Sequence, residues 1–145
     1  MIGRDGQRDG FDGALICIDQ SNSGNVRRIT YAAANNAPVL IKNRETIVLE
    51  HDRVPVGKSE KSESFSLFEL SIQDGETLYL YTDGYADQFG GEKGKKFKSK
   101  KLNELLLEIN LKSMQQQKAA ISETFENWKG ELEQIDDVCV IGLRL

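Results

Sequence analysis

Acidic side chains occupy two places where a predicted strand meets a loop. Asp83 ends the run TLYLYTD, and Asp136 and Asp137 open the last apolar run, DDVCVIGLRL. Carboxylates at strand ends are held on rigid backbone, and several at one sheet edge form an oxygen-rich site for Mg²⁺ or Mn²⁺. Asp87 projects from the same side as Asp83 if the residues after Gly84 form a helical turn. The alternative is structural: Asp83-Gly84 is a turn and Asp136 initiates a strand.

A lysine-rich stretch, GGEKGKKFKSKK at residues 90–101, follows Asp83 closely. It carries six lysines but lacks the Gly-x₄-Gly-Lys-Ser/Thr register of a nucleotide-binding phosphate loop. One interpretation is a solvated loop. The other is that these lysines attract an acidic or phosphorylated substrate to the mouth of a site.

Three further side chains are candidates for chemistry or binding. The single histidine, His51 in VLEHDRV, has no positioned partner that would make it an acid or a base. We predict that it is a surface strand residue. Phe125 and Trp128 share a helix face and are predicted to belong to the core, although they could instead contact a regulatory domain.

Composition is that of a globular protein. The 145 residues suffice for one domain with a real core, and 39% hydrophobic and 29% charged residues exclude collagen-like or wholly disordered chains. A net charge of −4 argues against duplex DNA binding, which depends on lysine and arginine. Cys17 and Cys139 lie in apolar runs, as free thiols do in a reducing compartment. With no membrane span and no signal-peptide core, we expect a soluble, cytoplasmic chain.

The elements that would position these residues are strands first and helices later. Runs of strand composition lie at residues 14–19, 26–34, 38–42, 45–50, 65–72, 77–83 and 136–145. Asn35-Asn36 and Asn43-Arg44 separate three of them, which predicts a meander of antiparallel strands. The residues from Gln73 to Glu76 are predicted to form a hairpin turn.

The spacing of apolar residues changes from strand-like to helical in the last third of the chain. Four apolar residues recur at helical spacing in a first helix, and four share one face of a second helix that Gly130 ends. These are Leu102, Leu105, Leu106 and Ile109, then Met114, Ile121, Phe125 and Trp128. Strands, a helix pair and a last strand predict an α+β fold in which the helices cover one face of a mainly antiparallel sheet.

The acidic motifs and their flanking residues resemble those of a known enzyme family. LYLYTDGYADQFGG and EQIDDVCVIGLRL closely resemble the C-terminal part of the SpoIIE-type branch of metal-dependent, PP2C-like serine/threonine phosphatases. RDGFDGALICID, ITYAAANNAPVLI and VPVGK resemble upstream segments of the same family. The resemblance runs in the right order from Asp9 to Leu145, and it implies a PP2C-like αββα sandwich.

The resemblance also implies a chemistry. Asp83 and Asp136 match family ligands for two Mn²⁺ or Mg²⁺ ions, Asp87 matches a position that helps hold a further metal in some relatives, and Asp137 matches a position that supports the site. In the family, a metal-activated water attacks the phosphorus of phosphoserine or phosphothreonine. The implied substrate is a small phosphorylated protein of bacterial signalling, such as an anti-sigma-factor antagonist.

One family motif is missing from the sequence. In the family, an aspartate followed by a Gly-His-Gly element normally lies upstream of the segment that matches RDGFDG. That aspartate bridges both metals. Two cations about 3.5–4 Å apart need shared ligation, so Asp83 and Asp136 alone would hold at most one weakly bound, hydrated ion. We therefore expect residues 1–145 to be a single phosphatase domain truncated at its N-terminal side.

Two functions follow from these observations. The first is a phosphoprotein phosphatase domain that is inactive as this chain alone. The second is a non-catalytic, phosphatase-like binding module. In either case we expect a protein partner rather than nucleic acid. We also expect an upstream regulatory or sensor domain, through which the whole protein could be tethered to a membrane. Exposed sheet surface at the truncated side predicts self-association.

Overall fold

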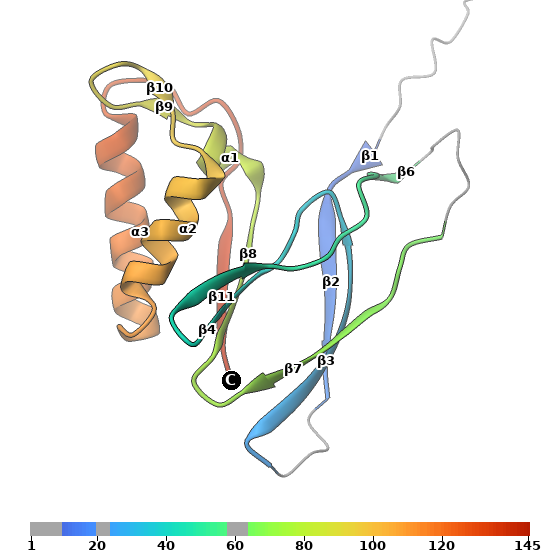
Figure 1. Cartoon of the computed structure of the whole chain (residues 1–145). Helices are drawn as coiled ribbons and strands as arrows, with labels where there is room; N and C mark the ends of the chain where they lie inside the picture. The colour runs from blue at the N-terminus through green and yellow to red at the C-terminus, as the bar shows by residue number, and fades with distance from the viewer. Residues whose placement is uncertain (1–9, 20–23, 58–63) are drawn as a thin grey trace, which may run out of the picture.

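The computed structural model describes residues 10–19, 24–57 and 64–145 (Figure 1). Its helices are α1 (Asp83–Asp87), α2 (Ser99–Ile109) and α3 (Met114–Lys129). The strands are β1 (Gly10–Phe11), β2 (Gly13–Ile18), β3 (Val26–Ala34), β4 (Val39–Lys42), β5 (Glu45–Val48), β6 (Val56–Gly57), β7 (Phe68–Gln73), β8 (Thr77–Tyr81), β9 (Phe89–Gly90), β10 (Lys95–Lys96) and β11 (Val140–Arg144).

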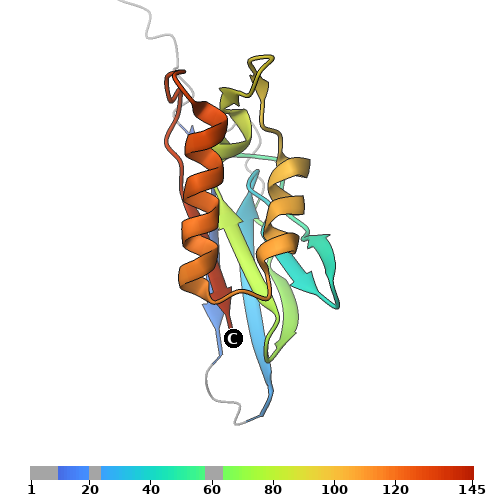
Figure 2. The same cartoon turned by 90° about the vertical axis from the view of Figure 1, so that its left-hand side faces the viewer.

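The longer strands form two antiparallel sheets. One has three strands in the order β2-β3-β7, and the other has four in the order β11-β8-β4-β5. The sheets face each other, and α2 and α3 cover the outer side of the four-stranded sheet (Figures 1 and 2). The described residues therefore form three layers: sheet, sheet and helix pair. The predicted antiparallel α+β architecture is confirmed, and the second helix layer of an αββα sandwich is not among the described residues.

The predicted meander is wrong at its first connection. β3 pairs with β2 and β7, whereas β4 pairs with β5 and β8, so the chain crosses between sheets after Ala34. The predicted hairpin from Gln73 to Glu76 is likewise a crossing, from β7 to β8. The reason is packing: the inner apolar faces of both sheets must be buried, and facing sheets bury each other. The predicted β4–β5 hairpin does form, with positive φ at Asn43 and Arg44.

Strand β8 lies between two hydrophobic cores. Leu78 packs between the sheets with Ile29, Leu40 and Ile72. Tyr79, one residue on, points to the other face and packs under the helices. Both side chains are about 1% exposed, so the strand is buried on both sides. Successive side chains of a strand point to opposite faces, which is why neighbours in the run TLYLYTD enter different cores.

The two long helices are present as predicted, and α3 ends at Gly130, where the sequence predicted its end. Ser113 and Gln116 form a capping box at the start of α3, and Gly130 ends the helix with a φ of 54°. The helices bury Leu102, Leu106, Ile109 and Phe125. Trp128 is partly buried against the same core. The core assignment of Phe125 and Trp128 is thus confirmed.

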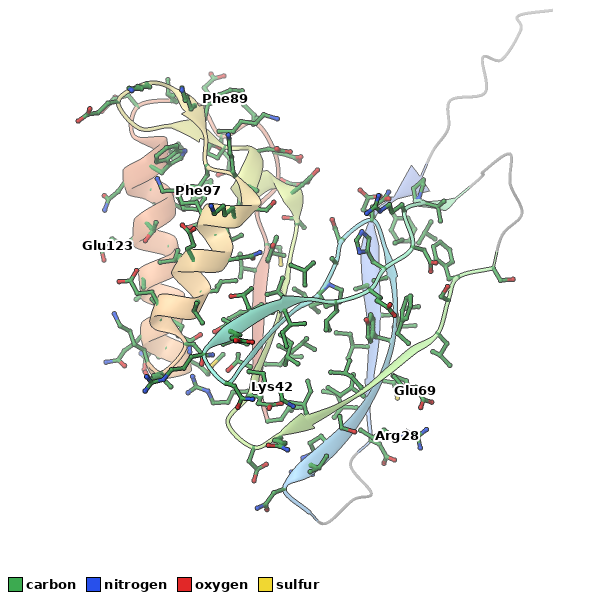
Figure 3. The ribbon with its side chains drawn as sticks, viewed as in Figure 1. Arg28, Lys42, Glu69, Phe89, Phe97 and Glu123 are labelled. Atoms are coloured by element: carbon green, nitrogen blue, oxygen red, sulfur yellow. The ribbon has the colours of Figure 1, made fainter. Side chains whose placement is uncertain are left out.

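The outer face of the three-stranded sheet exposes apolar surface. Ile16 and Ile18 pack into the core between the sheets, so Leu15 and Cys17 point the opposite way by the alternation of the strand. Leu15 is 78% exposed and Cys17 is also exposed. Arg28 and Glu69 form an ion pair of 2.8 Å between β3 and β7 (Figure 3). Self-association through this face stays a prediction, which light scattering can check.

Burial of the tyrosines predicts a loss of stability at alkaline pH. Burial raises the pKa of all four above 10, most strongly that of Tyr85. Above pH 10 the unfolded chain therefore releases these protons more readily than the folded chain, and the stability present at lower pH is lost as pH rises. We expect Tyr85 to contribute a loss of about 1 kcal/mol between about pH 9 and 11.

Urea unfolding at several pH values, followed by circular dichroism, measures this effect. The variant Tyr85→Phe is the control, because it removes the titrating hydroxyl and keeps the ring that packs against Phe97 and Phe125. Its unfolding free energy should fall less steeply between these pH values. Identical slopes in the variant and the parent chain would contradict the prediction.

Candidate functional site

Asp83 begins a short helix directly after a buried strand. β8 ends at Tyr81, Thr82 takes the N-cap position, and α1 runs over Asp83–Asp87. The helical turn after Asp83 is therefore present, as the placement of Asp87 required. Asp83 is exposed, and a carboxylate in the first turn of a helix is favoured by the helix dipole.

The segment that carries Asp136 and Asp137 lies against the start of α1. The Thr82 hydroxyl donates to the carbonyl oxygen of Asp137 at 3.0 Å and accepts from the backbone N–H of Cys139 at 3.0 Å. The backbone N–H of Thr82 donates to the carbonyl oxygen of Cys139, also at 3.0 Å. Segments more than fifty residues apart in the chain are thus joined at the N-terminal end of α1.

Gly84 allows this close approach. A Cβ atom at this position would lie 2.2 Å from the carbonyl oxygen of Asp137 and 3.3 Å from Cγ2 of Val138. Any side chain would therefore push the two segments apart. Glycine is required here because of backbone contact, and not because of a positive φ.

Asp136 and Asp137 lie in a loop rather than at the start of a strand. The predicted final strand begins at residue 136, but β11 begins at Val140. The Oδ1 atom of Asp136 accepts from the backbone N–H of Asp137 at 2.7 Å, and the carbonyl of Asp136 accepts from the Gln134 side chain at 2.9 Å. These local hydrogen bonds compete with strand pairing, and they leave both aspartates exposed.

Asp87 has a different partner from the one that the sequence suggested. Its Oδ1 atom lies 3.1 Å from Nζ of Lys96, on the lysine-rich stretch. Both side chains are partly exposed. The described structure therefore places Asp87 in an ion pair with that stretch.

A small cleft of about 160 Å³ opens between the sheets near this end of β8. Its walls come from the start of β2, the β3–β4 connection, the end of β8 and the start of β11. They include Asp12, Asn36, Thr82 and Cys139. Asn36 and Thr82 were not predicted to belong to the site, although polar residues directly after β3 and β8 are the sequence signal that could have indicated them. Asp12 accepts from the Asn35 side chain at 2.7 Å, which links β2 to the β3–β4 connection.

The acidic side chains at this end of the molecule supply some of the oxygen ligands that the implied Mn²⁺ or Mg²⁺ would need. Asp83 and Asp136 offer exposed carboxylate oxygens on two hydrogen-bonded segments, which suits a hard, hydrated divalent cation. Within residues 10–19, 24–57 and 64–145, however, no three or more His, Cys, Asp or Glu side chains are grouped as a metal site would require. His51 is half-buried and lies outside the strands, with Nδ1 3.4 Å from the Leu49 carbonyl oxygen. The residues present fit part of a metal centre.

Comparison of the sequence with protein-family models shows the family to which the chain belongs. The model of the family described as stage II sporulation protein E (SpoIIE) matches residues 14–145. The chain belongs to the SpoIIE family. The described part of this SpoIIE-family chain contains no helix with the length and apolar character needed to cross a membrane.

Solved phosphatase domains have the same fold. The SiaA-PP2C domain of Pseudomonas aeruginosa is 26% identical, with a TM-score of 0.82 over 92% of this chain. The phosphatase domain of the cell fate determinant SpoIIE from Bacillus subtilis is 15% identical, with a TM-score of 0.56 over 92% of this chain. A Mn-presoaked structure of the same domain is 14% identical, with a TM-score of 0.56. No match was found among curated protein sequences.

The matches cover only part of each solved domain. This SpoIIE-family chain spans 51% of the SiaA-PP2C domain and 57% of the Bacillus subtilis phosphatase domain. The PP2C-like fold is therefore confirmed over a chain about half as long as these domains. The metal-ligand assignments of Asp83, Asp87, Asp136 and Asp137 remain predictions.

Proposed function

We propose that this chain is part of a metal-dependent phosphoprotein phosphatase domain, and that Asp83 and Asp136 are its metal ligands. One observation supports the proposal above the others: Thr82 holds the Asp136–Cys139 segment against the start of α1 through three hydrogen bonds. The two acidic motifs, which are far apart in the sequence, are thereby joined through the hydroxyl and the backbone N–H of Thr82. A packing role alone would not require an exposed carboxylate on each side of that junction.

The residues of the chain have distinct parts in this proposal. Asp83 and Asp136 would hold Mn²⁺ or Mg²⁺ with their exposed oxygens, while Asp137 fixes the loop through its backbone carbonyl. Asp87 would have to leave Lys96 before it could approach a further ion. When bound, the ions supply the positive charge that activates water and neutralises the phosphoryl group. The bridging carboxylate would come from a part of the domain outside this chain.

The substrate class in this proposal is a phosphorylated protein. We place the phosphoryl group on serine or threonine of a small bacterial signalling protein, such as an anti-sigma-factor antagonist. An upstream regulatory or sensor domain would control the activity. The family membership supports the reaction type, and the substrate belongs to the proposal alone.

The proposal is tested by hydrolysis of p-nitrophenyl phosphate. We expect the native protein that contains this chain to hydrolyse it only with Mn²⁺ or Mg²⁺, to lose activity on chelation, and to regain it when the ion is returned. We expect the 145-residue chain alone to be inactive, because it lacks the bridging ligand. Activity that survives chelation, or rapid hydrolysis by the isolated chain, would contradict the proposal.

A second candidate function is a phosphatase-like module that binds a partner without turnover. It is favoured by the small number of acidic ligands grouped within the described residues. Calorimetric titration of the native protein with Mn²⁺ separates the two functions. Binding of two ions favours the enzyme, and the absence of Mn²⁺ binding favours the module.

A further inference from the structure

The most strongly charged surface outside the candidate site is the lysine segment, residues 90–101. It has six lysines and one glutamate, a net charge of +5, in a chain whose net charge is −4. All the other residues together therefore carry −9. A patch whose sign opposes that of the rest of the molecule is the usual electrostatic feature of a surface that attracts an anion.

The base of the lysine segment is held rigidly on α3. The backbone N–H of Gly91 donates to the carbonyl oxygen of Trp128 at 2.9 Å, and the indole N–H of Trp128 donates to the carbonyl oxygen of Gln88 at 3.0 Å. A Cβ at Gly90 would lie 1.8 Å from the Trp128 carbonyl oxygen. Phe97, only 3% exposed, anchors the other end of the β9–β10 ribbon in the helix-side core. A loop with no role beyond solvation would not need such a fixed base.

Four of the six ammonium groups have neither an acidic partner nor an aromatic ring contact within the described residues. Lys96 pairs with Asp87, and Nζ of Lys101 lies 3.9 Å from the centre of the Trp128 ring. The other four are exposed side chains of the ribbon and of the start of α2. They are Lys93, Lys95, Lys98 and Lys100. Their charges are therefore open to an external anion.

The surroundings of the lysine segment favour an acidic protein over a phosphate polymer. The backbone N–H of Lys98 donates to the carbonyl oxygen of Ala86 at 2.8 Å, which places the segment beside α1, the helix that begins at Asp83 (Figure 1). Phe89 lies at the ribbon, 40% exposed (Figure 3). Aromatic side chains are enriched at protein interfaces, and charges complementary to those of the partner steer the encounter. A nucleic acid or an anionic membrane would bring extended negative charge against a chain that is itself negative.

We propose that Lys93, Lys95, Lys98 and Lys100 form a docking surface for an acidic segment of the protein substrate. That the partner is the substrate rests on the proposed function, whereas the docking surface itself does not. The lysines attract the acidic segment and hold the partner beside α1, so that its phosphoryl group is presented to the end of the molecule that carries Asp83. Because the contact is electrostatic and exposed, it weakens as salt screens the charges.

Binding of a fluorescein-labelled oligoglutamate peptide, followed by anisotropy, tests the docking surface directly. We expect the 145-residue chain to bind this peptide, and the variant K93Q/K95Q to bind it about tenfold more weakly. Raising NaCl from about 50 to about 300 mM should also weaken binding of the peptide by the parent chain. The matched control is K112Q/K118Q, which also removes two exposed lysines but lies outside the segment. Its affinity should stay within about twofold of the parent chain.

Three results would overturn the docking surface: no binding of the peptide, equal weakening by both variants, or tighter binding of oligouridylate or of phosphatidylserine vesicles that K93Q/K95Q abolishes. The anisotropy measurement involves no hydrolysis. If the peptide binds as expected while the native protein shows no Mn²⁺-dependent hydrolysis, the proposed phosphatase function fails and the docking surface remains. If hydrolysis is present and K93Q/K95Q binds normally, the docking surface fails alone.

Discussion

Replacement of Asp83 by asparagine should reduce the Mn²⁺-dependent phosphatase activity of the native protein by about a thousandfold or more. Asparagine keeps the size of the side chain and removes the negative charge that a hard cation requires. The Asp83 side chain is exposed and, among the residues that the structure describes, makes no hydrogen bond that holds α1 in place, since α1 is fixed through Thr82 and Gly84. The loss should therefore come from metal binding rather than from unfolding. Hydrolysis of p-nitrophenyl phosphate over a range of Mn²⁺ concentrations measures it.

Asp87→Asn is the matched control for this experiment. It removes the same charge from the same short helix, but the carboxylate of Asp87 is engaged by Lys96 at 3.1 Å. We expect a loss of no more than about a hundredfold, the upper end of the range for a residue outside the immediate ligands. Equal activity of Asp83→Asn and the parent protein would refute the assignment of Asp83 as a ligand. A larger loss of activity in Asp87→Asn than in Asp83→Asn would mean that Asp87 is the metal ligand and that Asp83 lies outside the immediate ligands.

Local elements of the fold could be predicted from the sequence more reliably than their pairing. The run VRRITYAAA corresponds to β3 (Val26–Ala34), and the helical spacing around Leu106 locates α2, because side-chain periodicity reflects which faces are buried. The same periodicity is satisfied whether β3 pairs with β4 or faces it across a core. Burial of Ile29 against Leu40 from the other sheet decides between these arrangements, and that contact is a property of the whole domain.

The candidate site was predictable to a similar extent. The motifs around Asp83 and Asp136 could be found because each acidic residue stands next to an apolar run of the sequence, and the structure joins their segments. The means of joining them is Thr82, whose hydroxyl bonds to residues more than fifty positions away, and no local pattern identifies such a partner. The ion pair of Asp87 with Lys96 depends on the β9–β10 ribbon folding back on α1, which the charge pattern alone does not specify.

Gly84→Ala should destabilise the chain by about 2–3 kcal/mol and separate the two acidic segments. The added methyl group would lie 2.2 Å from the carbonyl oxygen of Asp137 and 2.9 Å from its carbonyl carbon, so the backbone itself must move. Movement of this loop breaks the hydrogen bonds of Thr82 with Asp137 and Cys139. Urea unfolding of the chain gives the stability change, and Mn²⁺-dependent hydrolysis by the native protein reports on the site.

Gly24→Ala separates this steric effect from the general effect of replacing glycine. A Cβ at Gly24 would meet no heavy atom within 4 Å, so its unfolding free energy should change by less than about 0.5 kcal/mol. If the displacement of the Asp137 loop is what matters, Gly84→Ala will also lose hydrolysis under conditions where circular dichroism shows it to be folded. Parent-like stability and activity in Gly84→Ala would mean that the two segments are not held in contact, and the proposed metal pair of Asp83 and Asp136 would lose its structural basis.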